Sequence, residues 1–166
     1  MRAAEEQNRE NLPLCNKAAG VIFDMSAESG LYDSAFHALF REQMSPNHRF
    51  TADQMKAFNA LKHEPLTTDP VAREKRGKDF DEVYIKPFDP LNDEFGKKFK
   101  DDIPAMEDLQ ATMLAKLNRP FQKLSAIEAV KLNGMFLGPV TLDYTARYFQ
   151  RLSNDLGCPA LPSFDR

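Results

Sequence analysis

Residues 140–157 read VTLDYTARYFQRLSNDLG, and this stretch decides the class of fold. Its apolar side chains recur at intervals that place them on one face of an α-helix: Leu142, Ala146, Phe149 and Leu152. Gly157 follows the last turn and is a typical residue at the end of a helix. The stretch therefore predicts an amphipathic helix that begins at Val140.

Two further helices are predicted upstream of this one. Between Ile103 and Leu117, apolar residues form a second stripe at helical spacing, which ends before Pro120: Met106, Leu109, Met113 and Leu117. Ser125 and Glu128 have the spacing of a capping box, which favours a helix that begins there and ends at Gly134. Residues 105–157 are therefore predicted to form a group of three helices.

A helical hairpin is predicted at residues 31–62. Its first helix carries an apolar face of Tyr32, Phe36, Leu39 and Phe40, and it should stop before Pro46. The second helix begins with a capping box formed by Thr51 and Gln54. Residues 1–30 are interpreted as an N-terminal arm or short helix, and residues 158–166 as a tail.

Prolines divide the middle of the chain, residues 63–104, at positions 65, 70, 87, 90 and 104. Proline interrupts helices and central strands because it lacks the backbone N–H group, so this segment is expected to be extended and irregular. The whole chain is therefore predicted to be one all-α domain of about five helices. The predicted core residues are Phe36, Phe40, Met55, Phe58, Leu109, Met113, Ile127, Val130, Leu142 and Phe149.

The middle segment also carries regularly placed aromatic side chains, namely Phe80, Tyr84, Phe88, Phe95 and Phe99. Aromatic side chains are favoured anchors in protein interfaces, which makes these five the candidate partner-binding residues. The alternative is that they pack against the helices of this chain and complete its core.

The first hairpin bears a weak resemblance to the EF-hand family. Three apolar residues precede a loop, namely Phe36, Leu39 and Phe40, and Phe50 and Thr51 precede a capped helix. Residues 138–144 repeat this order of an apolar residue followed by threonine, with a glycine ahead of it. The resemblance implies a hairpin able to receive a partner peptide. It does not imply calcium binding, because the comparable positions lack the carboxylates that calcium requires: Gln43, Ser45, Asn47 and Gln54, then Asn133, Met135, Leu137 and Tyr144.

No catalytic or metal-binding pattern is evident in the sequence. His37, His48 and His63 are not spaced to share a helical face, and there is no nucleophile elbow or phosphate-binding glycine loop. Nucleic acid is also not expected, because the basic run at residues 73–78 is interrupted by acidic residues and the net charge is −3. No cofactor, metal or small-molecule substrate is predicted.

The two cysteines, Cys15 and Cys158, are expected to be free thiols, since a disulfide-framed domain normally carries more. The alternative is a disulfide that closes a very large loop, which requires the fold to bring the two ends of the chain together. Without a long apolar run or a secretory signal, the protein is expected to be soluble and intracellular, in the cytoplasm or an organellar matrix. The leading hypothesis is a non-catalytic accessory or structural subunit of a larger assembly, which binds other protein subunits. The alternatives are an adaptor that uses the EF-hand-like hairpin, and a small enzyme of unrecognised class.

Overall fold

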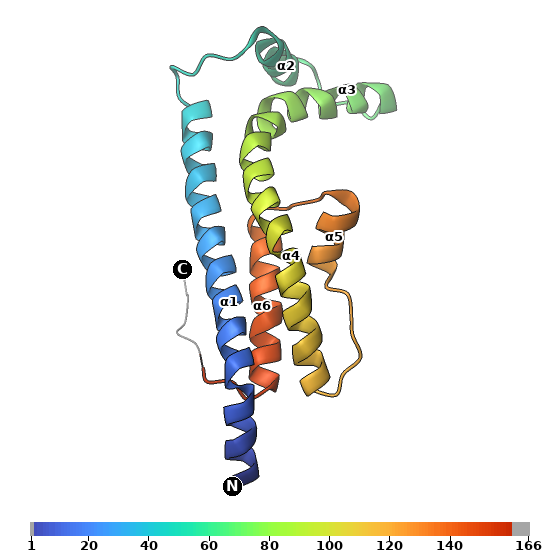
Figure 1. Cartoon of the computed structure of the whole chain (residues 1–166). Helices are drawn as coiled ribbons and strands as arrows, with labels where there is room; N and C mark the ends of the chain where they lie inside the picture. The colour runs from blue at the N-terminus through green and yellow to red at the C-terminus, as the bar shows by residue number, and fades with distance from the viewer. Residues whose placement is uncertain (1, 161–166) are drawn as a thin grey trace. The chain divides into compact units, whose positions relative to one another are not determined.

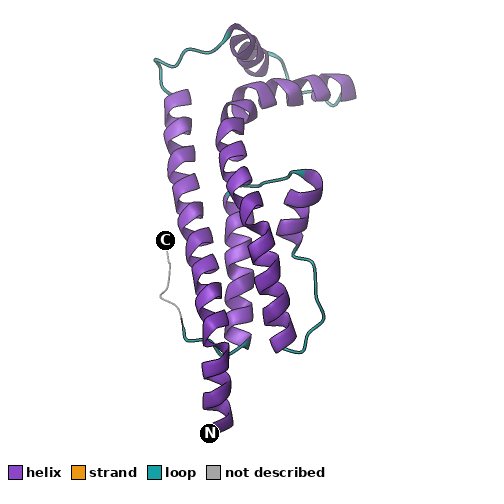
Figure 2. Cartoon of the chain, viewed as in Figure 1, coloured by secondary structure: helices purple, strands orange, loops and turns teal. Residues whose placement is uncertain are grey.

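The computed structural model describes residues 2–160, apart from the side chains of residues 2–4, 7 and 8. Within this part the chain forms helices and turns but no strand, which confirms the all-α fold (Figures 1 and 2). In chain order the elements are α1 (Arg2–Gln43), α2 (Ala52–His63), α3 (Pro70–Phe80), the π-helical turn η1 (Asp81–Ile85), the 3-10 turn η2 (Lys86–Phe88), α4 (Asp89–Lys116), α5 (Ser125–Asn133) and α6 (Pro139–Asp155). None of these helices combines the length and apolar character needed to cross a membrane.

The chain divides into two compact units, and the long helices α1 and α4 each contribute to both. Unit 1 contains the residues up to Asp33 and those from Glu94 onward, and unit 2 contains Ser34–Asp93. Each unit has its own set of buried side chains.

In unit 1, α1, α4 and α6 lie alongside one another, with α1 running in the opposite direction to the other two (Figure 1). The core side chains include Phe99, Met106, Met113, Leu142 and Phe149, all of which are fully buried. The predicted core residues Leu109, Ile127 and Val130 are also buried. The periodicity of the last third therefore identified the core of this unit correctly.

The N-terminal residues do not form a separate arm, because α1 is a single helix of 42 residues. Pro13 lies inside it, where it removes one backbone hydrogen bond. The following turns compensate by burying a stripe of mostly small or flexible side chains, Cys15, Ala18, Ile22 and Met25. Packing along this stripe overrides the local effect of the proline, which explains why the predicted boundary at residue 31 is wrong.

The expectation of free thiols is wrong as well. Cys15 and Cys158 form a disulfide, with their Cα atoms 5.5 Å apart, although 143 residues separate them in sequence. The antiparallel course of α1 and α6 brings the end of α6 back to the early turns of α1 (Figure 1). This long-range juxtaposition could not be read from the positions of two cysteines in the sequence.

Most of the segment that was expected to be irregular, residues 63–104, is helical, and only residues 64–69 lie outside the helices and helical turns. Pro70, Pro87 and Pro90 lie in the first turns of α3, η2 and α4, where the missing N–H group has no partner within the helix. Asp69 caps α3 by accepting a hydrogen bond from the backbone N–H of Ala72 at 3.1 Å. These prolines begin helices, and the prediction of an extended segment at residues 63–104 is therefore corrected.

Unit 2 has a small core, in which Ala57, Val83, Phe88 and Leu91 are the buried apolar residues. Two of its predicted core residues, Phe40 and Met55, are instead exposed, while Phe36 and Phe58 are half-buried. A few helical turns in a unit of this size provide too little surface to cover both faces of each helix. Apolar side chains consequently remain at its surface.

The two predicted capping boxes have different outcomes. The Thr51 hydroxyl accepts a hydrogen bond from the Gln54 backbone N–H at 3.2 Å, and the Gln54 side chain accepts one from the Thr51 backbone N–H at 3.0 Å, which confirms the first box. The second is wrong, because Leu124 occupies the N-cap of α5 without a side-chain hydrogen bond. The Ser125 hydroxyl lies instead 3.4 Å from the hydroxyl oxygen of Tyr144.

Candidate protein-interaction surface

The five predicted partner-binding residues do not form one surface. Phe95 and Phe99 belong to unit 1, where Phe99 is fully buried and Phe95 is half-buried with its ring 5.3 Å from that of Tyr32. In unit 2, Phe88 is buried and stacks on Phe36 with the ring centroids 4.6 Å apart. These three aromatic side chains contribute to the packing of their own chain.

Phe80 and Tyr84 remain available at the surface of unit 2. Phe80 is the last residue of α3, and Tyr84 follows one turn later in η1, so that their rings lie 5.0 Å apart. Phe80 is 47% exposed, while Tyr84 is half-buried. Of the five predicted partner-binding residues, Phe80 and Tyr84 are therefore the two that a partner could contact at the surface of unit 2.

Helix α3 contributes little to the core of unit 2. Within Pro70–Phe80, all of which the structure describes, no residue is buried. Ion pairs lie along the helix instead: Lys75 Nζ is 3.0 Å from Glu64 Oε1 and 3.2 Å from Asp79 Oδ2. Exposed ion pairs of this kind contribute little stability, so they hold α3 to α2 only weakly.

A groove with a volume of about 420 Å³ lies between α2 and α3. Leu61, Leu66 and Phe80 provide its apolar surface, and Arg73, Arg76 and Asp81 are its charged residues. Leu66 is 83% exposed. We call this feature the α2–α3 groove, defined by Leu61, Leu66, Thr67, Arg73, Arg76, Gly77, Phe80 and Asp81.

The α2–α3 groove has a fixed basic side. Arg76 donates hydrogen bonds to the carbonyl oxygens of Leu61 and Glu64, each at 3.4 Å, which connects α3 to the end of α2. Arg73 lies one turn earlier on the same helix, and Asp81 is the one acidic residue among those that line the groove. The balance of charge favours an acidic ligand.

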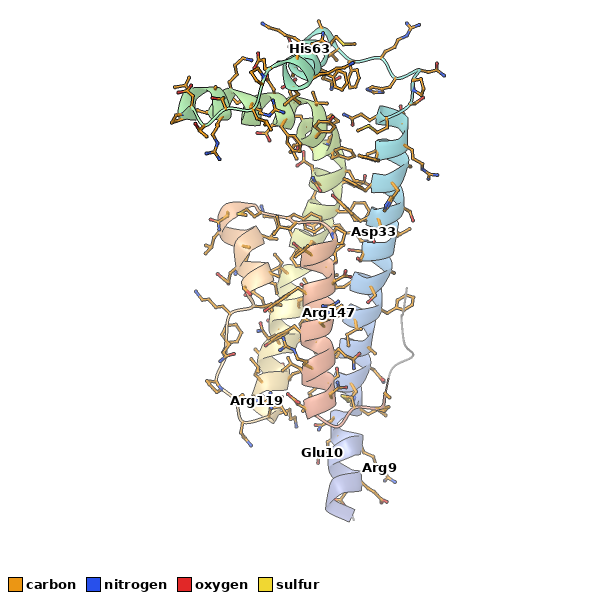
Figure 3. The ribbon with its side chains drawn as sticks, turned by 180° about the vertical axis from the view of Figure 1, so that it is seen from behind. Arg9, Glu10, Asp33, His63, Arg119 and Arg147 are labelled. Atoms are coloured by element: carbon orange, nitrogen blue, oxygen red, sulfur yellow. A yellow bond between two sulfur atoms is a disulfide. The ribbon has the colours of Figure 1, made fainter. Side chains whose placement is uncertain are left out.

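A second hollow in unit 2, with a volume of about 650 Å³, lies between α2 and the segment formed by α3 and η1. Its lining alternates between acidic and basic side chains, and it includes His63, which is labelled in Figure 3. Lys75 is already paired there with Glu64 and Asp79. Charges that neutralise one another in this way do not select a ligand of either sign.

The histidines are dispersed in the structure. The ring of His48 packs against Phe50 with the centroids 4.7 Å apart, and the ring of His37 lies 6.1 Å from that of Phe36. Among the residues that the structure describes, no group of three or more His, Cys, Asp or Glu side chains is placed to hold a metal ion. Of the two hollows described in unit 2, the α2–α3 groove is the one whose charged lining is mainly of one sign.

Comparisons with protein-family models, with curated proteins and with solved structures found no match for this chain.

Proposed function

We propose that this protein is a non-catalytic subunit of a larger protein assembly, and that it binds a neighbouring protein through the α2–α3 groove. The observation that supports the proposal is the set of uncovered apolar side chains around α3. Leu66, in the connection before α3, is 83% exposed. Val71 and Phe80, on α3, are 74% and 47% exposed, and this helix buries none of its own residues. Large apolar side chains gathered at a surface are typical of protein-binding sites.

The chemistry of the groove indicates the kind of segment that would bind. Leu61, Leu66 and Phe80 suit an apolar side chain of the partner, and Arg73 and Arg76 suit acidic residues beside it. A segment of another protein with a large apolar residue flanked by Asp or Glu satisfies both requirements. We therefore expect the partner to present such a segment rather than a basic one.

The disulfide bears on where this assembly is located. Disulfides persist mainly in oxidising compartments, whereas cytosolic thiols are kept reduced. The Cys15–Cys158 bond therefore supports a location in an oxidising compartment rather than in the reducing cytoplasm.

The experiment compares the native complexes of the wild-type protein and a double variant, Leu66→Ala with Phe80→Ala. Each tagged protein is expressed in its natural source and crosslinked, and its mass is measured on a native gel. We expect the wild-type chain to run in a larger species containing a different protein, and the double variant to lose that species. Both positions are exposed, so unfolding of the isolated chain should change little.

Phe121→Ala provides the matched control, because Phe121 is a similarly exposed phenylalanine in unit 1. This variant should retain the larger species. A wild-type protein that runs alone, or a larger species that persists in the double variant, would contradict the proposal. A species that contains only copies of this chain would assign the groove to self-association instead.

A further inference from the structure

A cavity of about 370 Å³ lies in unit 1, where α4, α6 and the loop after α4 meet. This volume is within the range of sites for small ligands. Its apolar surface comes from three leucines, Leu114, Leu124 and Leu152. Most of the polar side chains that line it carry a charge or a hydroxyl group: Arg119, Lys123, Ser125, Tyr144, Tyr148, Arg151 and Asp155. Gln122 and Pro120 complete the lining. Figure 3 labels Arg119, which lies beyond the end of α4.

The charges around the cavity are unbalanced. Of its three basic side chains, Arg119 is neutralised by Asp155, with Nη1 and Oδ2 2.7 Å apart. Lys123 and Arg151 have no carboxylate within ion-pair distance among the residues that the structure describes. Two cations that line one concave surface without acidic partners favour a ligand with a negative charge.

A buried glutamine holds one wall of the cavity in place. Gln110, on α4, is 1% exposed, and its Nε2 donates hydrogen bonds to the carbonyl oxygen of Gln122 at 2.7 Å and to the hydroxyl oxygen of Tyr148 at 2.9 Å. These two bonds connect the loop and α6 to the interior of the unit. A binding site benefits from such bonds because its shape then needs little ordering when a ligand arrives.

The hydrogen bond from Gln110 also determines how Tyr148 can interact with a ligand. Its oxygen accepts the hydrogen bond from Gln110, which leaves its own hydroxyl hydrogen to be donated elsewhere. Tyr144 lies one turn earlier on α6 and also lines the cavity. The site thus combines phenol rings and leucines for an apolar body with cations and a hydroxyl for a charged group.

We propose that this cavity binds a small organic anion. Lys123 and Arg151 bind its carboxylate or phosphate group, Tyr148 donates a hydrogen bond to it, and its apolar body packs against Leu124 and Tyr144. The proposal rests on unit 1 alone and does not depend on the proposed assembly role of unit 2. A result that contradicts one of the two proposals therefore does not contradict the other.

Tyrosine fluorescence offers a direct measurement, because the chain has four tyrosines and no tryptophan, and Tyr144 and Tyr148 line the cavity. The full-length oxidised protein is titrated with benzoate, phenyl phosphate, inorganic phosphate and the neutral benzyl alcohol, and calorimetry confirms each constant. We expect saturable binding of benzoate, phenyl phosphate or both. Their relative affinities then distinguish a carboxylate ligand from a phosphate ligand. Inorganic phosphate and benzyl alcohol should each bind at least tenfold more weakly than the better organic anion.

The variants Lys123→Gln and Arg151→Gln should each weaken binding of that anion about tenfold, the usual effect of losing one charge-assisted hydrogen bond. Lys116→Gln is the matched control, since Lys116 is an exposed cation in the last turn of α4 that does not line the cavity. It should bind like the wild type, as should the Leu66→Ala, Phe80→Ala variant of unit 2. The proposal is overturned if neither organic anion binds with a dissociation constant below about 10 mM. It is also overturned if inorganic phosphate or benzyl alcohol binds as tightly as the better organic anion, or if both glutamine variants retain wild-type affinity.

Discussion

Lys98 Nζ lies 2.6 Å from Glu28 Oε1, so that a carboxylate buried on α1 is paired with a cation on α4. The Glu28 side chain is 5% exposed and that of Lys98 is 63% exposed. The other carboxylate oxygen of Glu28 and the hydroxyl of Ser29 are buried without a hydrogen-bond partner in the described part of the chain. The contact with Lys98 is therefore the one ion pair that compensates the buried charge of Glu28 in the described part of the chain.

The first prediction concerns this pair. Lys98→Met should lower the free energy of unfolding by about 1–3 kcal/mol, because it leaves a buried carboxylate without its cation. The double variant Glu28→Leu with Lys98→Met should recover most of that loss, since neither charge then remains. Urea unfolding measures both values, and Lys100→Met, at an exposed position of the same helix, is the control. A double variant as unstable as Lys98→Met would contradict the explanation.

The second prediction concerns pH. Burial raises the pKa of the Asp102 carboxyl above its ordinary value; Lys98 opposes this effect, and the nearby charge of Asp24 adds to it. The folded protein therefore binds this proton more tightly than the unfolded chain, and the ionised carboxylate lowers stability at pH values above its folded pKa. Asp102→Asn should raise the unfolding midpoint at pH 7.

This gain should disappear as the pH falls below the ordinary carboxyl pKa of about 4, where Asp102 is protonated in both states. Chemical unfolding of the wild-type protein and the variant between pH 3 and pH 7 tests the dependence. Asp108→Asn, at an exposed position of α4, is the control for a general effect of removing one negative charge. A gain that is independent of pH would rule out the titration of Asp102 as its cause.

The third prediction concerns the disulfide. The Cys15–Cys158 bond closes a loop across a separation of 143 residues, and its loss should lower the free energy of unfolding by about 2–5 kcal/mol. The variant Cys15→Ser with Cys158→Ser should match the wild-type protein treated with a reductant. Because the variant has no disulfide to lose, the reductant should leave its own unfolding curve unchanged. Equal midpoints for the oxidised wild-type protein and the variant would show that the bond does not stabilise the fold.

The fourth prediction concerns Gly138, which caps α6 with φ at +58°. A Cβ atom there would lie 2.8 Å from Cζ of Tyr32, whose ring is itself packed against Phe95. Gly138→Ala should therefore cost about 2–4 kcal/mol, from the strained backbone together with the contact. Gly134→Ala has a similar φ of +64° but open space around the added atom, and it should cost only about 1–2 kcal/mol. Because ψ is −128° at Gly138 and 17° at Gly134, the difference between the two losses measures the backbone strain and the Tyr32 contact together. Equal losses in thermal unfolding would contradict both.

Much of unit 1 could be predicted from the sequence, and the reason is local. The stripe that includes Leu142 and Phe149 has the period of a helix, and Gly134 ends α5 with a positive φ, as expected. The Thr51–Gln54 box was also predicted, because its hydrogen bonds join residues within a single turn. Such features depend on neighbours in the chain and little else.

The effect of each proline on helix boundaries could not be predicted from the sequence alone. Pro70 and Pro90 were expected to interrupt structure, yet each begins a helix, because a proline in the first turn loses no helical hydrogen bond. Whether a proline ends or begins a helix depends on how the following residues pack. Packing also decides which of the predicted partner-binding residues stay at the surface. Phe99 lies on α4 and is buried in unit 1, whereas Phe80 is exposed in unit 2.

By itself, the sequence determined the helical class, most helices of the last third and one helix cap, because spacing and capping act over a few residues. Only the tertiary structure decided that Cys15 meets Cys158, that Glu28 depends on Lys98, and that Arg151 shares a cavity with Lys123. These pairs come from different helices or from a helix and a loop. Their meeting depends on the direction in which each helix packs, which is set by the core as a whole.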